Sequence, residues 1–265
     1  MSSAGPTPLS EILAYLSEIG YGDLYLRPAA SPVREAVEPV QAKTAAAPAP
    51  RPAPAPELTV PPASPPPLRA VAAPAAPDAG ARLAELEGLA ATVAGCTRCR
   101  LAEGRKNVVF GSGNPNADLM LVGEGPGAEE DRQGLPFVGP AGELLTKIIQ
   151  AIDLKREEVY IANVVKCRPP GNREPQPDEV QACRGFLEKQ IALVRPRILV
   201  ALGRTAAQTL LGNESPIGQL RGRWHQVLGI PTMVTYHPAA LLRNQALKRP
   251  TWEDMQQVRD RLRGG

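Results

Sequence analysis

Four cysteines place the strongest constraint on how this 265-residue chain can fold. Cys96 and Cys99 form a Cys-x2-Cys pair, and Cys167 and Cys183 follow after a long gap, with fifteen residues between them. A Cys-x-x-Cys pair directs two thiolates at one site, and two distant cysteines can complete a four-thiolate cage. A metal centre that joins these separate segments is therefore the first hypothesis.

The spacing leaves other readings of these cysteines open. Four thiolates suit either zinc or an iron–sulfur cluster, and the residues alone favour zinc. Unrelated thiols can also pack as small apolar side chains. Disulfides require an oxidising compartment, but the N-terminus lacks the basic region and apolar core of a secretory signal. Nor does any apolar run approach the ~20 residues that span a bilayer. We therefore expect a soluble, cytoplasmic protein without membrane association.

Composition predicts three parts. Residues 28–80 hold half of the thirty prolines and no aromatic side chain, which indicates a disordered Pro/Ala-rich linker. Residues 1–27 contain apolar positions at helical spacing, namely Leu9, Ile12, Leu13, Leu16 and Ile19. They predict a short amphipathic helix that either docks on a protein partner or packs on its own domain. Residues 81–265 have the size of one domain.

The third part alternates between strand and helix patterns. Apolar runs predict buried strands at 118–122, 159–162, 197–202 and 231–235. Helical patterns lie between them at 140–152, 178–194 and 205–211, with further helices at 82–93 and 251–262. This alternation predicts an α/β fold with a parallel sheet.

Unusual residues follow the predicted strands. Gly123-Glu-Gly-Pro-Gly127 follows the first strand, Asn163 the second, and His237 the fourth, while Phe137 lies in a proline- and glycine-rich loop. Ligands of open α/β sheets bind outside the carboxyl ends of the strands. Each residue alone is more often structural. Together they predict a pocket for a flat, hydrogen-bonding ring, and basic residues in several loops suit either a polyanion or a solvated surface.

Four segments, interleaved with the cysteines, resemble the family 4 uracil-DNA glycosylases. They are Gly123-Glu-Gly-Pro-Gly127, Leu135-Pro-Phe-Val-Gly139, Asn163-Val-Val-Lys-Cys-Arg-Pro-Pro170 and His237-Pro-Ala-Ala-Leu-Leu-Arg243. The resemblance implies a three-layer sandwich with a central four-stranded parallel sheet. It also implies a [4Fe–4S] cluster, in place of zinc, with Cys96, Cys99, Cys167 and Cys183 as ligands. A monomer acting on uracil-containing DNA is expected.

The resemblance further implies how the base is held. Phe137 would stack on the flipped uracil, and Asn163 would pair with its polar edge and reject cytosine. Glu130 would lie near the ring and help to fix the base. His237 would donate toward the carbonyl oxygen O2, where negative charge collects as the glycosidic bond breaks.

The remaining implied roles concern sugar, water and DNA. Glu124 and Gly125 would form the turn beneath the sugar. Leu241 would wedge into the gap left by the base, and Arg221 and Arg243 would lie near phosphates.

One departure and one comparison with a related branch qualify these expectations. Gly125 stands where another branch of the superfamily has an aspartate that orients water. The general base therefore stays open between Glu124, Glu130 and a backbone carbonyl. The loop 169–175 has no histidine, unlike a branch that attaches covalently to DNA, so turnover is expected. The alternatives are a non-catalytic, metal-stabilised nucleic-acid-binding module and a polymerase-associated domain.

Overall fold

The computed structural model describes residues 79–264. The docking helix predicted within residues 1–27, and the linker predicted after it as far as residue 78, lie outside this range and remain predictions. Across residues 79–264, no helix has both the length and the apolar character needed to cross a membrane.

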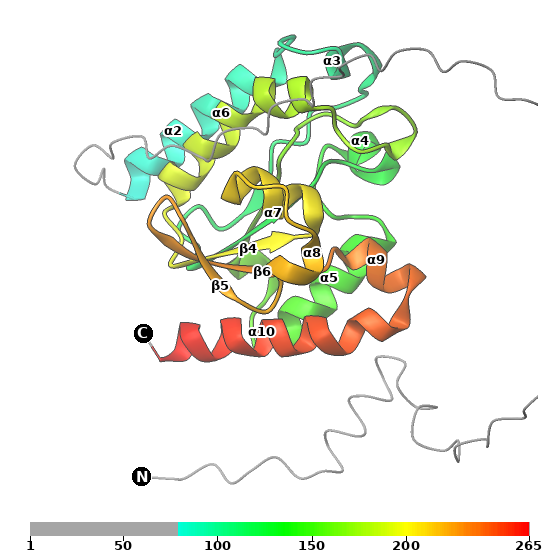
Figure 1. The fold of residues 1–265 in the computed structure, drawn as a ribbon. Helices are drawn as coiled ribbons and strands as arrows, with labels where there is room; N and C mark the ends of the chain where they lie inside the picture. Colours follow the sequence, from blue (N-terminus) through cyan, green and yellow to red (C-terminus); the bar gives the residue numbers. More distant parts are fainter. Residues whose placement is uncertain (1–78, 265) are drawn as a thin grey trace, which may run out of the picture. The chain divides into compact units, whose positions relative to one another are not determined.

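A six-stranded mixed sheet forms the centre of the described fold (Figure 1), in the order β1-β3-β2-β4-β6-β5. Its strands are β1 (Ser112–Gly113), β2 (Leu119–Gly123), β3 (Tyr160–Asn163), β4 (Ile198–Leu202), β5 (Trp224–Val227) and β6 (Ile230–Thr235). The strands β3, β2, β4 and β6 pair in parallel, whereas β1 and β5 pair antiparallel at the two edges. The expected four parallel strands are therefore present, but the sheet has two further antiparallel strands at its edges. The edge strands escaped prediction because β1 has two residues and β5 is largely polar.

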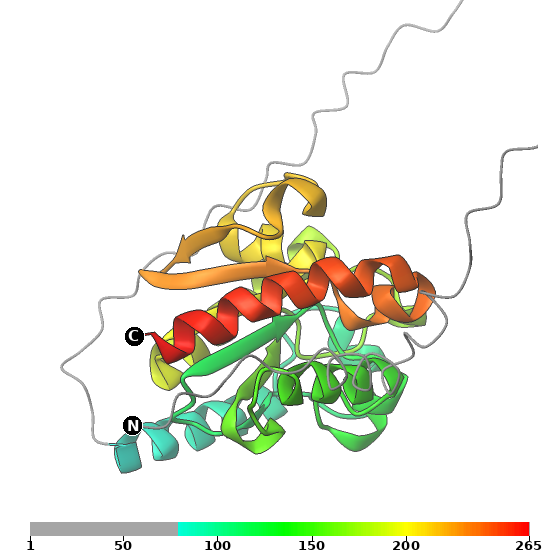
Figure 2. The same cartoon turned by 90° about the horizontal axis from the view of Figure 1, so that it is seen from below.

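Helices cover both faces of the sheet. On one face lie α2 (Ala79–Ala94), α6 (Pro177–Val194) and α7 (Arg204–Leu211), and on the other α5 (Pro140–Gln150) and α10 (Lys248–Arg263), which Figure 2 shows running along the sheet. Strand β2 alternates between the two cores, because Met120 and Val122 join the first and Leu119 and Leu121 the second. Strands buried on both faces consist of continuous apolar runs, which is why the sequence predicts them.

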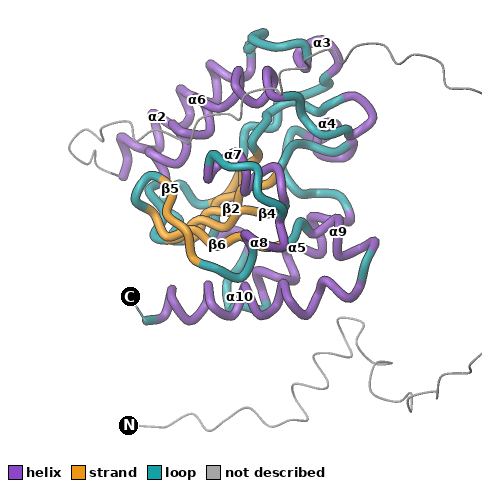
Figure 3. Tube along the Cα trace, viewed as in Figure 1, coloured by secondary structure: helices purple, strands orange, loops and turns teal. Residues whose placement is uncertain are grey.

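Short helices gather around the loops that follow the strands (Figure 3). They are α3 (Leu101–Gly104), α4 (Ala128–Gln133), α8 (Ile217–Leu220) and α9 (Pro238–Arg243), with 3-10 turns at 156–158, 170–172 and 245–247. Strand β2 has β3 on one side and β4 on the other, so the chain changes direction across the sheet at β2. Such a switch point leaves a crevice at the carboxyl ends of the strands, where ligands of α/β proteins bind.

Candidate functional site

A cavity of about 350 Å³ opens at this crevice. Seven of the nine residues expected to act on the base or on DNA line it, namely Glu124, Gly125, Glu130, Phe137, Asn163, His237 and Arg243. They come from the segments that follow β2, β3 and β6 and from the loop before α5. The other two, Arg221 and Leu241, are not among its lining residues.

The Phe137 ring owes its position to two glycines. Phe137 has a positive φ of 52°, and a Cβ at Gly142 would lie 1.9 Å from its carbonyl oxygen. A Cβ at Gly123 would lie 2.5 Å from both Phe137 Cζ and Asn163 Oδ1. Only glycine at the end of β2 therefore allows the ring and the amide to approach the backbone so closely.

Glu130 holds this loop in place. Its carboxylate accepts hydrogen bonds from the backbone N–H groups of Gly127 at 3.1 Å, Val138 at 2.9 Å and Gly139 at 3.0 Å. Both oxygens are thus engaged with the glycine turn and with the two residues after Phe137. The structure gives Glu130 a clear part in orienting the aromatic ring, in addition to its place in the cavity wall.

Asn163 presents an acceptor without a partner. The residue is 1% exposed, and among the described residues no donor reaches Oδ1. Its backbone oxygen accepts from Lys166 Nζ at 2.8 Å, and Lys166 Nζ also donates to Gln190 Oε1. A buried polar atom left unsatisfied costs about 1–3 kcal/mol, and such atoms in native proteins call for an explanation. A ligand N–H is the natural partner at this cavity.

His237 is neutral at physiological pH. Burial, followed by the nearby charge of Arg243, lowers the pKa of His237 to about 4. The His237 Nδ1 atom accepts a hydrogen bond from the Ala239 backbone N–H at 3.2 Å. Because a neutral imidazole has one protonated nitrogen, this contact assigns the proton to Nε2. His237 therefore offers the site a neutral N–H donor.

Glu124 is the carboxyl in the cavity wall that has a side-chain partner from another strand end. Thr205 Oγ1, at the start of α7, lies 2.5 Å from Glu124 Oε2. Burial raises the pKa of the Glu124 carboxyl above its ordinary value. At Gly125, an added Cβ would lie 2.7 Å from Val165 Cγ2, so the structure leaves little room for a side chain there.

The residues assigned to DNA contacts fall into different places. Arg243 is exposed and lines the cavity. The Arg221 guanidinium donates to buried Asp254, with Nε 3.1 Å from Oδ2, and to the Pro250 carbonyl at 2.6 Å. Leu241 is 2% exposed, whereas its neighbour Leu242 is 47% exposed. Leu241, the expected wedge, is therefore buried, and Leu242 is the exposed leucine of α9.

The four cysteines line a second, small cavity together. Two come from the turn after α2, one from the segment after β3 and one from α6. Lys166 and Arg105 also line this cavity, and Arg105 Nη1 lies 3.2 Å from Cys167 Sγ. Burial lowers the pKa of Lys166 to about 8. In the described part of the chain, no three His, Cys, Asp or Glu side chains converge as the ligands of one metal ion do.

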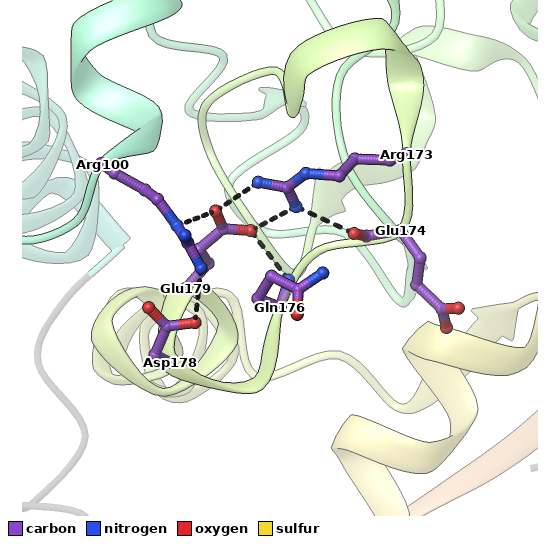
Figure 4. Close-up of polar contacts among 6 residues, drawn as sticks. All are labelled: Arg100, Arg173, Glu174, Gln176, Asp178 and Glu179. Atoms are coloured by element: carbon purple, nitrogen blue, oxygen red, sulfur yellow. Dashed lines mark hydrogen bonds and ion pairs between the residues drawn. The ribbon is translucent and has the colours of Figure 1, made fainter.

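Figure 4 shows a network of ion pairs and hydrogen bonds around Glu179. The Glu179 carboxylate, fully buried, accepts from Arg173 at 2.6 and 2.8 Å, from Arg100 at 3.0 Å and from the Gln176 N–H at 2.7 Å. Arg173 lines the first cavity, and Arg100 follows Cys99 directly. Hydrogen bonds from Arg173 are the main cause that lowers the pKa of Glu179 to about 2.

Sequence reasoning missed several of these partners. The sequence predicts Thr205 only as the first residue of a helix, and no signal marks Glu174, Glu179 or Gln190. Thr205 is a partner of the predicted site residue Glu124, and Glu174 is a partner of Thr205. Glu179 and Gln190 pair with Arg100 and Lys166, which are the chain neighbours of Cys99 and Cys167. A search for polar residues at helix starts near strand ends would have found Thr205.

Comparison with known proteins agrees with this geometry. Residues 110–256 match the model of the uracil DNA glycosylase superfamily. The chain is 46% identical over 168 residues to the type-4 uracil-DNA glycosylase of Thermotoga maritima, covering 62% of this chain and 88% of that protein. It is 44% identical over 184 residues to that of Sulfurisphaera tokodaii, covering 66% and 84% respectively. It is 43% identical over 186 residues to that of Saccharolobus solfataricus, covering 67% and 86%.

The family model spans more than half of the chain and includes every residue of the first cavity, so the chain belongs to the uracil DNA glycosylase superfamily, as a type-4 uracil-DNA glycosylase.

Proposed function

We propose that this glycosylase acts in base excision repair by holding an extruded uracil in the cavity and hydrolysing its N-glycosidic bond, which leaves an abasic site. A base inside a duplex cannot be reached, so the enzyme must extrude it at a cost of roughly a few kcal/mol. The observation that carries the proposal is the partnerless Oδ1 atom of Asn163 in the cavity wall. Uracil offers an N–H at ring position 3, whereas cytosine has an acceptor there and would leave two acceptors facing each other.

The aromatic ring of Phe137 supplies the stacking platform. Stacking of a base on an aromatic side chain contributes about 1–3 kcal/mol, which offsets part of the extrusion cost. Glu130 supports this role from behind, because its hydrogen bonds to Val138 and Gly139 hold the loop that carries the ring. Glu130 therefore contributes to base selection by fixing the position of the Phe137 loop.

His237 and Glu124 act on the charges that develop as the bond breaks. The Nε2–H of neutral His237 donates toward O2 of the departing uracil anion. An ionised Glu124 stabilises the positive charge on the sugar and holds the attacking water. Glu124 suits this role better than Glu130, whose oxygens already accept three backbone hydrogen bonds. The backbone of Gly125 completes the turn beneath the sugar.

Contacts to the DNA backbone and the gap come from α9 and its surroundings. Arg243 contacts a phosphate at the cavity mouth. Arg221 supports the nearby turn through Asp254, and any phosphate contact from it uses the N–H groups left over by that pair. We place the wedge at Leu242, since Leu241 would have to leave the protein interior to reach DNA.

A [4Fe–4S] cluster fits the cysteine cavity. The four thiols line one small space, and Arg105 and Lys166 would offset the negative charge of a thiolate-bound cluster. A cluster spreads its four thiolates over four iron atoms, so its ligands stand further apart than those of a single zinc ion. When bound, it would supply structural cross-linking of the segments at Cys96, Cys99, Cys167 and Cys183, and no chemical step passes through it.

The remaining parts of the proposal concern the whole protein. We expect it to work as a monomer in the cytoplasm. Residues 1–27 serve as a docking element for a protein partner, on a linker that ends before α2 begins at Ala79, two residues earlier than the predicted end at residue 80.

The proposal is tested by incubating the full-length protein with an oligonucleotide containing one uracil, followed by alkaline cleavage. Strand breakage at uracil is expected, with none in a thymine control. His237→Ala should abolish most of it, whereas His225→Ala should not, because His225 lies outside the cavity and its Nε2 is paired with the Leu220 carbonyl oxygen at 2.8 Å. DNA retention without any strand breakage would instead indicate a binding module.

A further inference from the structure

A single hydroxyl lies between two carboxyl groups beside the uracil cavity. Thr205 Oγ1 is 2.5 Å from Glu124 Oε2 and 2.8 Å from Glu174 Oε1. Thr205 is 7% exposed and is the second residue of α7, just after β4, whereas Glu124 follows β2. The three side chains therefore meet at the switch point of the sheet, where β2 and β4 lie side by side.

The chemistry of a hydroxyl limits how these contacts are satisfied. Thr205 has one proton to donate, but both carboxyl groups stand at hydrogen-bond distance. With both carboxyls ionised, one oxygen pair would face lone pair to lone pair. The hydroxyl therefore donates to one carboxylate at a time, and Glu124 Oε2, at 2.5 Å, is the nearer acceptor. This hydrogen bond favours ionised Glu124, whereas Glu174 competes for the same hydroxyl proton.

The surroundings of the two carboxyls differ. Glu174 is half-exposed and forms an ion pair with Arg204 at 2.6 Å. In Figure 4 its carboxylate points away from the Arg173–Glu179 pair. Glu124 lies in the cavity wall, and burial raises its pKa. The Thr205 hydrogen bond lowers the pKa of Glu124, the negative charge of Glu174 raises it, and Arg204 lowers it.

We propose that Thr205 and Glu174 are positioning residues that decide when Glu124 presents a negative charge to the sugar of the bound nucleotide, Thr205 by donating to its carboxylate and Glu174 by competing for the same hydroxyl. This rests on the proposed role of Glu124 in uracil excision. Other charged or titratable groups also face Glu124 across the cavity, namely Glu130, Arg173, His237 and Arg243. The pKa of His237 is about 4, so His237 is neutral in the pH range where the titration of Glu124 is followed.

The two partners act in opposite directions. Glu174→Gln removes the neighbouring negative charge, which lowers the pKa of Glu124 and lets the carboxylate form at lower pH. Thr205→Val removes the hydrogen bond that favours the carboxylate, which raises the pKa of Glu124. If excision needs ionised Glu124, the acid limb of the rate profile moves to lower pH in the first variant and to higher pH in the second. A structural role alone would not predict opposite shifts.

The experiment measures single-turnover uracil excision from about pH 4.5 to 9 with the cluster-loaded, full-length protein. Thr205→Ser keeps the hydroxyl and should restore the wild-type profile. Glu214→Gln and Thr209→Val are the matched controls. Glu214 is an exposed carboxyl near the same helix, and Thr209 is a buried threonine one turn further along α7. Both controls should leave the acid limb unchanged.

A direct titration separates this inference from the proposed function. The carboxyl carbon of Glu124, assigned by the signal lost in Glu124→Gln, is followed by ¹³C NMR in the absence of DNA. Shifts of its titration to lower pH in Glu174→Gln and to higher pH in Thr205→Val support the competition of Glu124 and Glu174 for the Thr205 hydroxyl. No shift, or shifts in the same direction, overturns it, even in a protein that excises uracil. Opposite titration shifts with an unchanged rate profile overturn the link to Glu124 charge.

Discussion

The imidazole of His237 packs against the ring of Phe137, with 5.5 Å between the ring centroids and an angle of 31° between the planes. The residue proposed to stack on the base thus also shields the residue proposed to stabilise the leaving group. Burial is the largest cause of the low pKa of His237. The platform and the donor are therefore parts of one apolar wall.

Removing the platform should change the titration of His237. In Phe137→Ala, water reaches the imidazole, and the pKa of His237 should rise from about 4 toward its ordinary value. Imidazole ¹⁵N NMR measures this directly, and Phe137→Leu, which stays apolar, should keep the pKa low. An unchanged pKa in the alanine variant would show that other groups bury His237.

Loss of the His237 donor should act on chemistry and leave binding in place. His237→Ala is expected to lower the single-turnover rate on the order of 100- to 1000-fold, as for other donors to a developing anion. Binding to DNA with a non-cleavable uracil analogue should change little, since the donor is matched to the charge that appears as the bond breaks. Equal losses in rate and affinity would contradict a role in the transition state.

Replacing Asn163 should reduce uracil excision much more than it changes the stability of the fold. Its Oδ1 atom is buried without a partner among the described residues, so Asn163→Ala is expected to change the free energy of unfolding by no more than about 1 kcal/mol. The same change should remove most uracil excision. Thermal unfolding and single-turnover rates test both halves. Strong destabilisation would mean that the amide has a structural partner in solution.

The two leucines of α9 should separate into a core role and a DNA role. Leu241→Ala is expected to destabilise the protein by about 2–5 kcal/mol, because the side chain is buried. Leu242→Ala should keep the stability but slow excision from duplex more than from single-stranded DNA, which has no stacked gap to fill. Selective loss of duplex activity in a stable Leu241→Ala protein would return the wedge to Leu241.

The ion pairs of Glu179 should make the free energy of unfolding depend on pH in the acid range. Because its pKa is held at about 2, the stabilisation from Glu179 is complete above about pH 5 and disappears as the pH falls toward 2. Glu179→Gln should lower the free energy of unfolding at pH 7 by about 2 kcal/mol and flatten its fall in acid. The exposed Arg249–Glu253 pair is the control, and Glu253→Gln should cost about 0.5 kcal/mol or less. Urea unfolding between pH 3 and 7 decides the matter.

Local patterns were sufficient for the buried core of this protein. The strands β2, β3, β4 and β6 and the long helices lie within about three residues of their predicted bounds, since burial imposes a period of two or 3.6 on neighbouring side chains. The short helices α4, α8 and α9 were not predicted. Elements of this length are held by contacts with the rest of the fold and show no periodic pattern of apolar residues. The two-residue edge strand β1 failed for the same reason.

Motifs in the sequence identify the candidate site residues, whereas the partners of those residues depend on how distant segments pack. Motif spacing predicts Phe137, Asn163, His237 and the four cysteines as site residues, and the structure places the first three in one cavity and the cysteines in another. It could not show that Leu241 faces inward, or that Thr205 joins Glu124 and Glu174 across separations of 81 and 31 residues. Side-chain direction at a helix end and hydrogen bonds between distant strand ends depend on register and crossover in the whole sheet. No local pattern encodes them.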